Sequence, residues 1–142
     1  MRAKPPTSFT FRAHGQFTTR VDGRLIISDV TGPWNKELVE QWAAASHPLA
    51  QALGPHVGIA VVRESMLCTP DALLVLRRAA QYAATSLACM AHVLVADKSV
   101  DGRDLIDASF IRAYDGALRF AIFYSLEEAQ AWALALLAEQ GL

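Results

Sequence analysis

The sequence has few of the residues and spacings that mark a metal centre or a disulfide scaffold. Its two cysteines, Cys68 and Cys89, are too few and too far apart for a disulfide framework or a Cys-x-x-Cys site, so we expect reduced, buried thiols. The four histidines are dispersed and match no recognised metal-binding pattern. We therefore predict neither a metal ion nor another cofactor.

The chain also lacks an excess of charge of one sign and a long hydrophobic run. Thirteen basic residues against fourteen acidic ones give a net charge of -1, which excludes a broad surface for nucleic acid or an anionic membrane. The longest apolar stretch, residues 131–138, is far shorter than the roughly 18 residues of a membrane-spanning helix. The N-terminal residues lack the apolar segment of a signal peptide, so a cytoplasmic location is expected.

Patterns typical of enzymes are also missing. The sequence contains neither a glycine-rich phosphate loop nor a nucleophile elbow. Ser65, His92 and Asp97 could form a triad in principle, but the sequence gives no support for one, because triads are defined by geometry. His92 lies inside an apolar stretch, where a hydrogen-bonded core or groove histidine is far commoner than a catalytic base. We expect a non-enzymatic protein with no catalytic residues.

What the sequence does contain is enough apolar material for one folded domain. The chain has 142 residues, of which 53% are hydrophobic, and this length can bury a substantial core. We divide it into a flexible N-terminus, residues 1–8, and one domain, residues 9–142. The apolar fraction exceeds what one small core absorbs, which suggests a covered partner surface, a bound ligand or a homodimer.

The domain should begin with a β-hairpin. Phe9-Thr10-Phe11 and residues 17–21 alternate apolar and polar side chains ahead of Asp22-Gly23, a dipeptide that favours a two-residue hairpin turn. Residues 24–30 form the returning strand. The helical spacing of the next apolar residues predicts a long helix that Pro48 kinks or restarts before it ends at Gly54-Pro55.

The rest of the sequence alternates strands and helices. Residues 57–62 and 90–96 are nearly continuous apolar runs, as expected of central strands covered on both faces. Thr69-Pro70-Asp71 opens the helix between them. A shorter helix over residues 102–114, a strand over residues 118–123 and a helix opened by the Ser125–Glu128 capping box complete the chain. The fold class is α/β, with a mixed sheet and four helices.

This order of elements resembles the SpoIIAA-like family, whose STAS-type fold is related to the SEC14 lipid-binding proteins. Three short stretches carry the resemblance: Gly32-Pro33-Trp34-Asn35, His92-Val93-Leu94-Val95, and Phe120-Ala121-Ile122-Phe123 leading into Glu128-Ala129-Gln130-Ala131-Trp132. The resemblance covers roughly residues 9–140. It implies a STAS-like domain that acts as a regulatory or protein-interaction module.

In STAS proteins that antagonise anti-sigma factors, a serine in an Asp-Ser-x-Gly motif is phosphorylated at the start of a helix. The corresponding stretch here is residues 66–72, where Thr69 falls near that serine. Neither the preceding aspartate nor the glycine is present, and Thr69 fits better as a helix N-cap.

Position marks the best candidates for a ligand or regulatory site. Arg63, Ser65 and Thr69 follow the strand over residues 57–62, and ligands of open α/β sheets tend to sit at the carboxyl ends of strands. The alternative is a solvated loop. Trp42, together with Tyr82, Tyr114 or Tyr124, can also line an apolar pocket, although core packing is the first interpretation of the tryptophans.

Two functions follow from these observations. The first is a non-enzymatic regulatory or interaction module with a protein partner, as the resemblance implies. The alternative is binding of a small apolar ligand or lipid, which predicts a cavity near the loop over residues 63–69 and the last two helices. A hydrolase that uses Ser65 and His92 is a third hypothesis, which a large separation of the two side chains would exclude.

Overall fold

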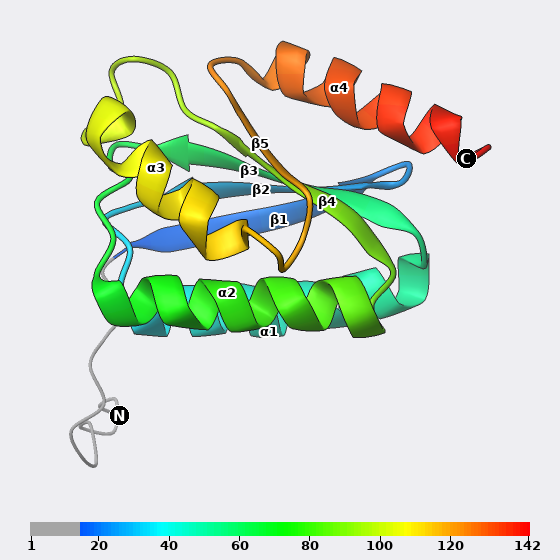
Figure 1. The fold of residues 1–142 in the computed structure, drawn as a ribbon, viewed down its shortest axis with the longest axis horizontal. Helices are drawn as coiled ribbons and strands as arrows, with labels where there is room; N and C mark the ends of the chain where they lie inside the picture. The colour runs from blue at the N-terminus through cyan, green and yellow to red at the C-terminus, as the bar shows by residue number, and fades with distance from the viewer. Residues whose placement is uncertain (1–14) are drawn as a thin grey trace, which may run out of the picture.

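A computed structural model describes residues 15–142 as an α/β domain with a five-stranded mixed sheet and four helices (Figure 1). The predicted fold class is thereby confirmed. The predicted flexible segment 1–8, the strand-like Phe9-Thr10-Phe11 and His14 lie outside the described residues.

The strands lie in the sheet in the same order as in the chain. β1 (Gln16–Asp22) pairs antiparallel with β2 (Leu25–Thr31), which confirms the predicted hairpin; Asp22 pairs with Leu25, so the two turn residues are Gly23 and Arg24, one position later than predicted. β3 (His56–Arg63), β4 (Cys89–Val95) and β5 (Phe120–Phe123) then add in parallel. An irregularity in the β3–β4 register next to His56 sets which β4 side chains face each side of the sheet.

The helices divide unequally between the two faces of the sheet. α1 (Lys36–Leu53), α2 (Pro70–Ser86) and α3 (Arg103–Tyr114) connect the parallel strands and lie on one face, and α4 (Leu126–Glu139) lies on the other (Figure 1). Parallel strands that follow one another in chain order, joined by crossovers of one hand, place every connecting helix on the same side.

Helix starts follow local capping chemistry. The Asn35 side chain accepts a hydrogen bond from the Leu38 amide, and Thr69 accepts one from the Ala72 amide. Ser125 accepts from the Glu128 amide at 3.2 Å, and its hydroxyl donates to the Glu128 carboxylate at 3.1 Å. The predicted helix starts at Thr69 and Ser125 are confirmed, because these oxygens satisfy amides that have no partner in the first turn.

A restart of the helix at Pro48, one of the two predicted outcomes, is wrong, since α1 continues through this residue as one helix. Proline removes one donor and crowds the carbonyl four residues earlier, which here belongs to Ala44. Ala44 is exposed, so water can reach that carbonyl, while the helix stays anchored to the sheet by Leu38, Val39 and Ala50, which are buried on either side of the proline.

Two apolar layers hold the sheet between the helices. Under α1, α2 and α3 the core centres on Trp34, which meets Trp42 and Phe110 edge to face with ring centroids 5.5 and 5.3 Å apart. Under α4 a second layer joins inward residues of β2, β3 and β4 to Ala133 and Leu136. The runs predicted as doubly covered strands are buried on both faces in β3 and β4, as expected of parallel strands.

No helix in residues 15–142 is both long and apolar enough to cross a membrane. The two cysteines in this part of the chain are free thiols, with Cys89 buried and Cys68 half-buried. Burial raises the pKa of each thiol to about 12, so both stay protonated and weakly nucleophilic at neutral pH.

Candidate functional site

Arg63, the first predicted site residue, is engaged on the surface of the sheet. Its guanidinium Nε and Nη2 donate to Oδ1 of Asp29 at 3.1 and 2.8 Å, and Arg20 approaches the same carboxylate at 3.7 Å. Asp29 and Arg63 occupy neighbouring strands on the face that α4 covers only in part. An exposed pair of this kind contributes about 0–1 kcal/mol to stability.

Ser65 and Thr69, the other predicted site residues, shape the loop between β3 and α2. The Ser65 side chain is buried and its hydroxyl accepts from the Leu67 amide at 3.0 Å. Thr69 is the N-cap of α2, and its hydroxyl also donates to Asp71. The hydrogen bond from Thr69 lowers the pKa of Asp71. Both side chains organise the loop, and neither lines the two hollows described below.

Ser65 and His92 lie too far apart to act together. His92 pairs with Gly58 near the amino-terminal end of β3, whereas Ser65 lies beyond the opposite end of that strand. At about 3.3 Å per strand residue, the stretch from Gly58 to the end of β3 at Arg63 alone spans roughly 16 Å. The triad of Ser65, His92 and Asp97 is therefore not assembled.

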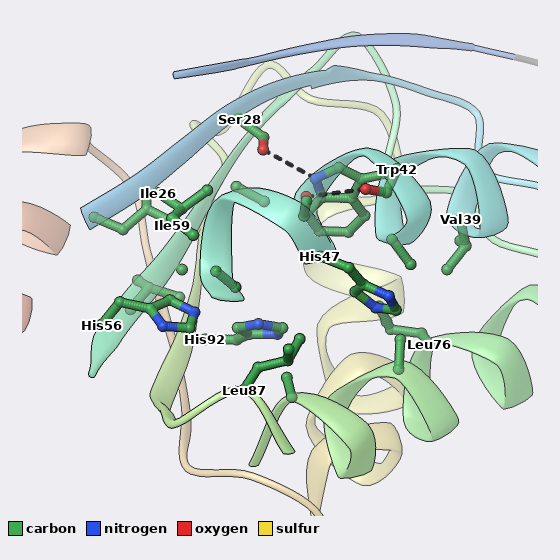
Figure 2. Close-up of a pocket in the computed structure, with 18 of the residues that line it drawn as sticks. Ile26, Ser28, Val39, Trp42, His47, His56, Ile59, Leu76, Leu87 and His92 are labelled. Carbon is green, nitrogen blue, oxygen red and sulfur yellow. Dashed lines mark hydrogen bonds between the residues drawn. The ribbon is translucent and has the colours of Figure 1, made fainter. Parts of the chain in front are cut away.

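A cavity of about 70 Å³ lies between α1, α2 and the strands β2, β3 and β4 (Figure 2). It lies beside the first halves of β2 and β3 and the middle of β4, beneath residues 39–50 of α1 and residues 76–83 of α2. The location predicted from sequence, near residues 63–69 and the last two helices, is therefore wrong for this cavity. A space of this size holds several water molecules or one small organic molecule.

Small side chains keep the cavity open. Ala43 and Ala50 of α1, Ala79 and Ala83 of α2, and Gly58 of β3 line it where larger residues would fill the layer. Gly58 also makes room for an imidazole, because a Cβ atom there would lie 2.9 Å from Cδ2 of His92. Ser46, His47 and Ala79 are only half-buried on the facing sides of α1 and α2, which places the entrance along this helix seam.

On one wall of the cavity, the polar groups of Trp42, Ser28 and Ser46 have hydrogen-bond partners within the protein. Trp42 Nε1 donates to the Ser28 hydroxyl at 2.9 Å (Figure 2). That hydroxyl also lies 2.9 Å from Thr19 Oγ1. The Ser46 hydroxyl donates to the Trp42 carbonyl at 2.9 Å. These hydrogen bonds hold the Trp42 indole in place. Trp42 lines the cavity, which was the alternative to simple core packing predicted for this residue.

The cavity contains three histidines, two of which come from neighbouring strands. His56 starts β3 and His92 lies in β4, so the two rings meet at one end, whereas His47 comes from α1 (Figure 2). The His47 ring packs on Tyr82 of α2, with the ring centroids 4.9 Å apart. Among residues 15–142 no group of three or more His, Cys, Asp or Glu side chains is arranged to hold a metal ion.

His92 and Tyr114 form the innermost polar contact of the cavity. Nδ1 of His92 lies 2.9 Å from the Tyr114 hydroxyl, and the Tyr114 ring stacks on Phe120 with centroids 4.2 Å apart. Burial, and to a lesser extent His56, lowers the pKa of His92 to about 4. His92 is thus a hydrogen-bonded groove histidine, as predicted, and is neutral at physiological pH.

The lining of the cavity contains no carboxylate, lysine or arginine. Burial also lowers the pKa of His56, although its hydrogen bond to the Gly54 carbonyl opposes this effect. An ion placed in the cavity would lose its hydration without gaining an opposite charge, so the arrangement suits an uncharged molecule.

Sequence reasoning anticipated Trp42 and Tyr114 as pocket-lining aromatics but missed the site as a whole. Tyr82 lies at the rim against His47, and Tyr124 lies elsewhere, 4.3 Å from the Arg103 guanidinium carbon. The available signals were a glycine in a β-branched strand and alanines spaced along both helices. Such residues are common in ordinary packing, so they mark a cavity only once the register is known.

A second, more open hollow of about 480 Å³ lies along residues 114–120, between α3 and β5. Its wall is mostly the loop that connects α3 to β5.

No model of a known protein family, no curated protein and no solved structure matches this chain.

Proposed function

We propose that this protein binds a small, uncharged and largely apolar molecule in the cavity between α1, α2 and the sheet. The observation that carries this proposal is a cavity of about 70 Å³ whose lining contains no charged residue. Binding sites typically combine apolar walls with a few placed polar groups, here His56 and His92. The volume favours a short organic molecule over the bulk of a lipid.

The proposed role is one of binding, without chemistry on the ligand. A nucleophile and a base within reach of each other would be needed for covalent catalysis. The two serine hydroxyls of the lining, Ser28 and Ser46, have hydrogen bonds to Trp42 instead. The low pKa of His92 also makes it a weak base at neutral pH.

Native mass spectrometry of the purified protein is the first experiment. A non-covalent mass that is lost on denaturation supports the proposal and identifies the ligand for extraction. A titration with 1-butanol, followed by amide chemical shifts, then tests the cavity directly. We expect saturable shifts at β3, β4 and the facing sides of α1 and α2.

A matched pair of variants locates the binding. Ala43→Leu places a larger side chain in the cavity, whereas Ala45→Leu makes the same change at an exposed position of α1. The proposal predicts that Ala43→Leu weakens butanol binding and that Ala45→Leu leaves it unchanged. Equal affinities in both variants, or the absence of saturable shifts in the wild type, contradict it.

A second candidate is the non-enzymatic regulatory or interaction role that the SpoIIAA-like, STAS-type resemblance implies. The outward side of α4 favours it, because Leu134 is 54% exposed and its exposed neighbours Ala131, Ala135 and Ala138 carry no charge. The partner we propose for this face is a second copy of the chain, since one face can pair with itself about a twofold axis.

Light scattering of the eluting protein tests this candidate. Leu134→Glu should turn a dimer into a monomer, and Leu105→Glu, at an 82% exposed position of α3, should have no effect. A wild-type protein that is monomeric at high concentration excludes the second copy as the partner.

A further inference from the structure

The two strand histidines carry the most specific chemistry left in the cavity. Each has one ring nitrogen in a hydrogen bond with the protein, and its other ring nitrogen has no partner among residues 15–142. Within residues 15–142 the only fully enclosed side-chain nitrogen or oxygen without a hydrogen-bond partner is Trp34 Nε1. The second nitrogens of His56 and His92 therefore border accessible space, and their protonation states determine what the cavity recognises.

His92 presents a hydrogen-bond donor. The Tyr114 side chain is buried, and in the described part of the chain its hydroxyl has His92 Nδ1 as its hydrogen-bond partner. Leaving a buried phenol proton without an acceptor is costly, so Tyr114 donates and Nδ1 accepts. In a neutral imidazole the ring proton then resides on Nε2. This atom belongs to the ring edge that lies over Gly58.

His56 presents the complementary acceptor. Its Nδ1 lies 2.8 Å from the Gly54 carbonyl oxygen, and a carbonyl oxygen can only accept a hydrogen bond. Nδ1 therefore carries the proton, which leaves a lone pair on Nε2. The residue is buried at the start of β3 and lines the same cavity as His92.

A donor and an acceptor on adjacent strands match a group that both accepts and donates. We propose, building on the binding function above, that the cavity recognises an aliphatic hydroxyl group through His92 and His56. The ligand oxygen accepts from Nε2–H of His92, and its O–H donates to Nε2 of His56. The hydrocarbon part lies against Ala79, Ala83 and Leu76. The ligand class is thus a short uncharged alcohol.

Other ligand classes fit less well. A hydrocarbon of the same size leaves both ring nitrogens without partners, and an ether satisfies only the His92 donor. A carboxylate brings a charge into a lining that contains no cation, and it offers no proton to His56. Each mismatch leaves a polar group desolvated and unpaired, which is the usual source of strong discrimination.

Two isomeric probes test this recognition. 1-Butanol donates and accepts a hydrogen bond, whereas methyl propyl ether has the same formula and only accepts. Because one hydrogen bond in a site contributes about a tenfold change in affinity, the alcohol should bind about tenfold more tightly than the ether. His56→Phe should reduce this preference to about one, and Gln81→Phe, at an exposed position of α2 outside the cavity lining, should retain it.

Imidazole nitrogen spectra provide a readout that needs no substitution. Proton-coupled ¹⁵N shifts should show the Nε2–H tautomer for His92 and the Nδ1–H tautomer for His56 at neutral pH. The opposite tautomer at either residue overturns the recognition scheme. Equal affinity for the two probes overturns it as well, while the binding function itself stands; if neither probe binds, both proposals fail.

Discussion

Protonation of His92 should destabilise the fold in mild acid. The imidazole lies between Gly58 and Tyr114, and burial lowers its pKa to about 4, compared with 6.5 for an unperturbed histidine. The unfolded chain therefore binds a proton at this position between pH 6.5 and pH 4, and the folded chain does not. Stability consequently falls as the pH decreases through this window.

The difference between the two pKa values sets the size of the effect. At 1.36 kcal/mol for each pKa unit, this difference at His92 lowers the free energy of unfolding by at most about 3 kcal/mol between pH 7 and pH 4. Since its side chain retains some exposed surface, we expect about 2–3 kcal/mol. That is a large part of the roughly 5–15 kcal/mol by which a domain is stable.

Urea unfolding at pH 7 and pH 4 of the wild type and His92→Gln measures this contribution. Glutamine cannot be protonated, and its side-chain oxygen can still accept from Tyr114. Between the two pH values the free energy of unfolding should fall by about 2–3 kcal/mol more in the wild type than in the variant. The contribution of the carboxylates cancels in this comparison, because they titrate equally in both proteins. The same loss in both proteins would refute the reasoning.

Three further predictions follow from the contacts described above. Gly58→Ala should lower the free energy of unfolding by about 1–3 kcal/mol and weaken butanol binding, because the new Cβ would lie 2.9 Å from the His92 ring. Thermal unfolding measures the first effect, and unchanged stability and binding would contradict the prediction. Thr69→Ala should cost about 1 kcal/mol through loss of the α2 cap, which chemical denaturation can measure. Thr69→Ser should restore most of this loss, and failure to do so would argue against the capping role. Cys68 and Cys89 should react with a disulfide reagent at pH 8 only as fast as the protein opens, because their pKa values are raised to about 12; immediate reaction in native buffer would show accessible thiolates.

The fold was predictable because its signals are local. Asp22-Gly23 locates the hairpin to within one residue, and the helix starts at Thr69 and Ser125 are fixed by side chains a few residues from the amides they cap. Pro48 shows where a local rule fails: packing on both sides of it retains a helix that the residue alone would interrupt.

The candidate site was not predictable in the same way. The cavity exists because small residues of α1, α2 and β3 face one another, a relation that no single segment contains. The irregular register beside His56 also determines that His92 points toward the cavity. Arg63 had the right position for a ligand contact, but its guanidinium pairs with Asp29 on the adjacent strand.

The chain order of the sheet has a consequence for synthesis on the ribosome. Each strand pairs with the one made just before it, so every addition needs only the contacts of neighbouring units. The cavity walls come from residues 26–114, and α4 packs against the opposite face. An emerging chain can therefore enclose this space before its last strand and helix have been made.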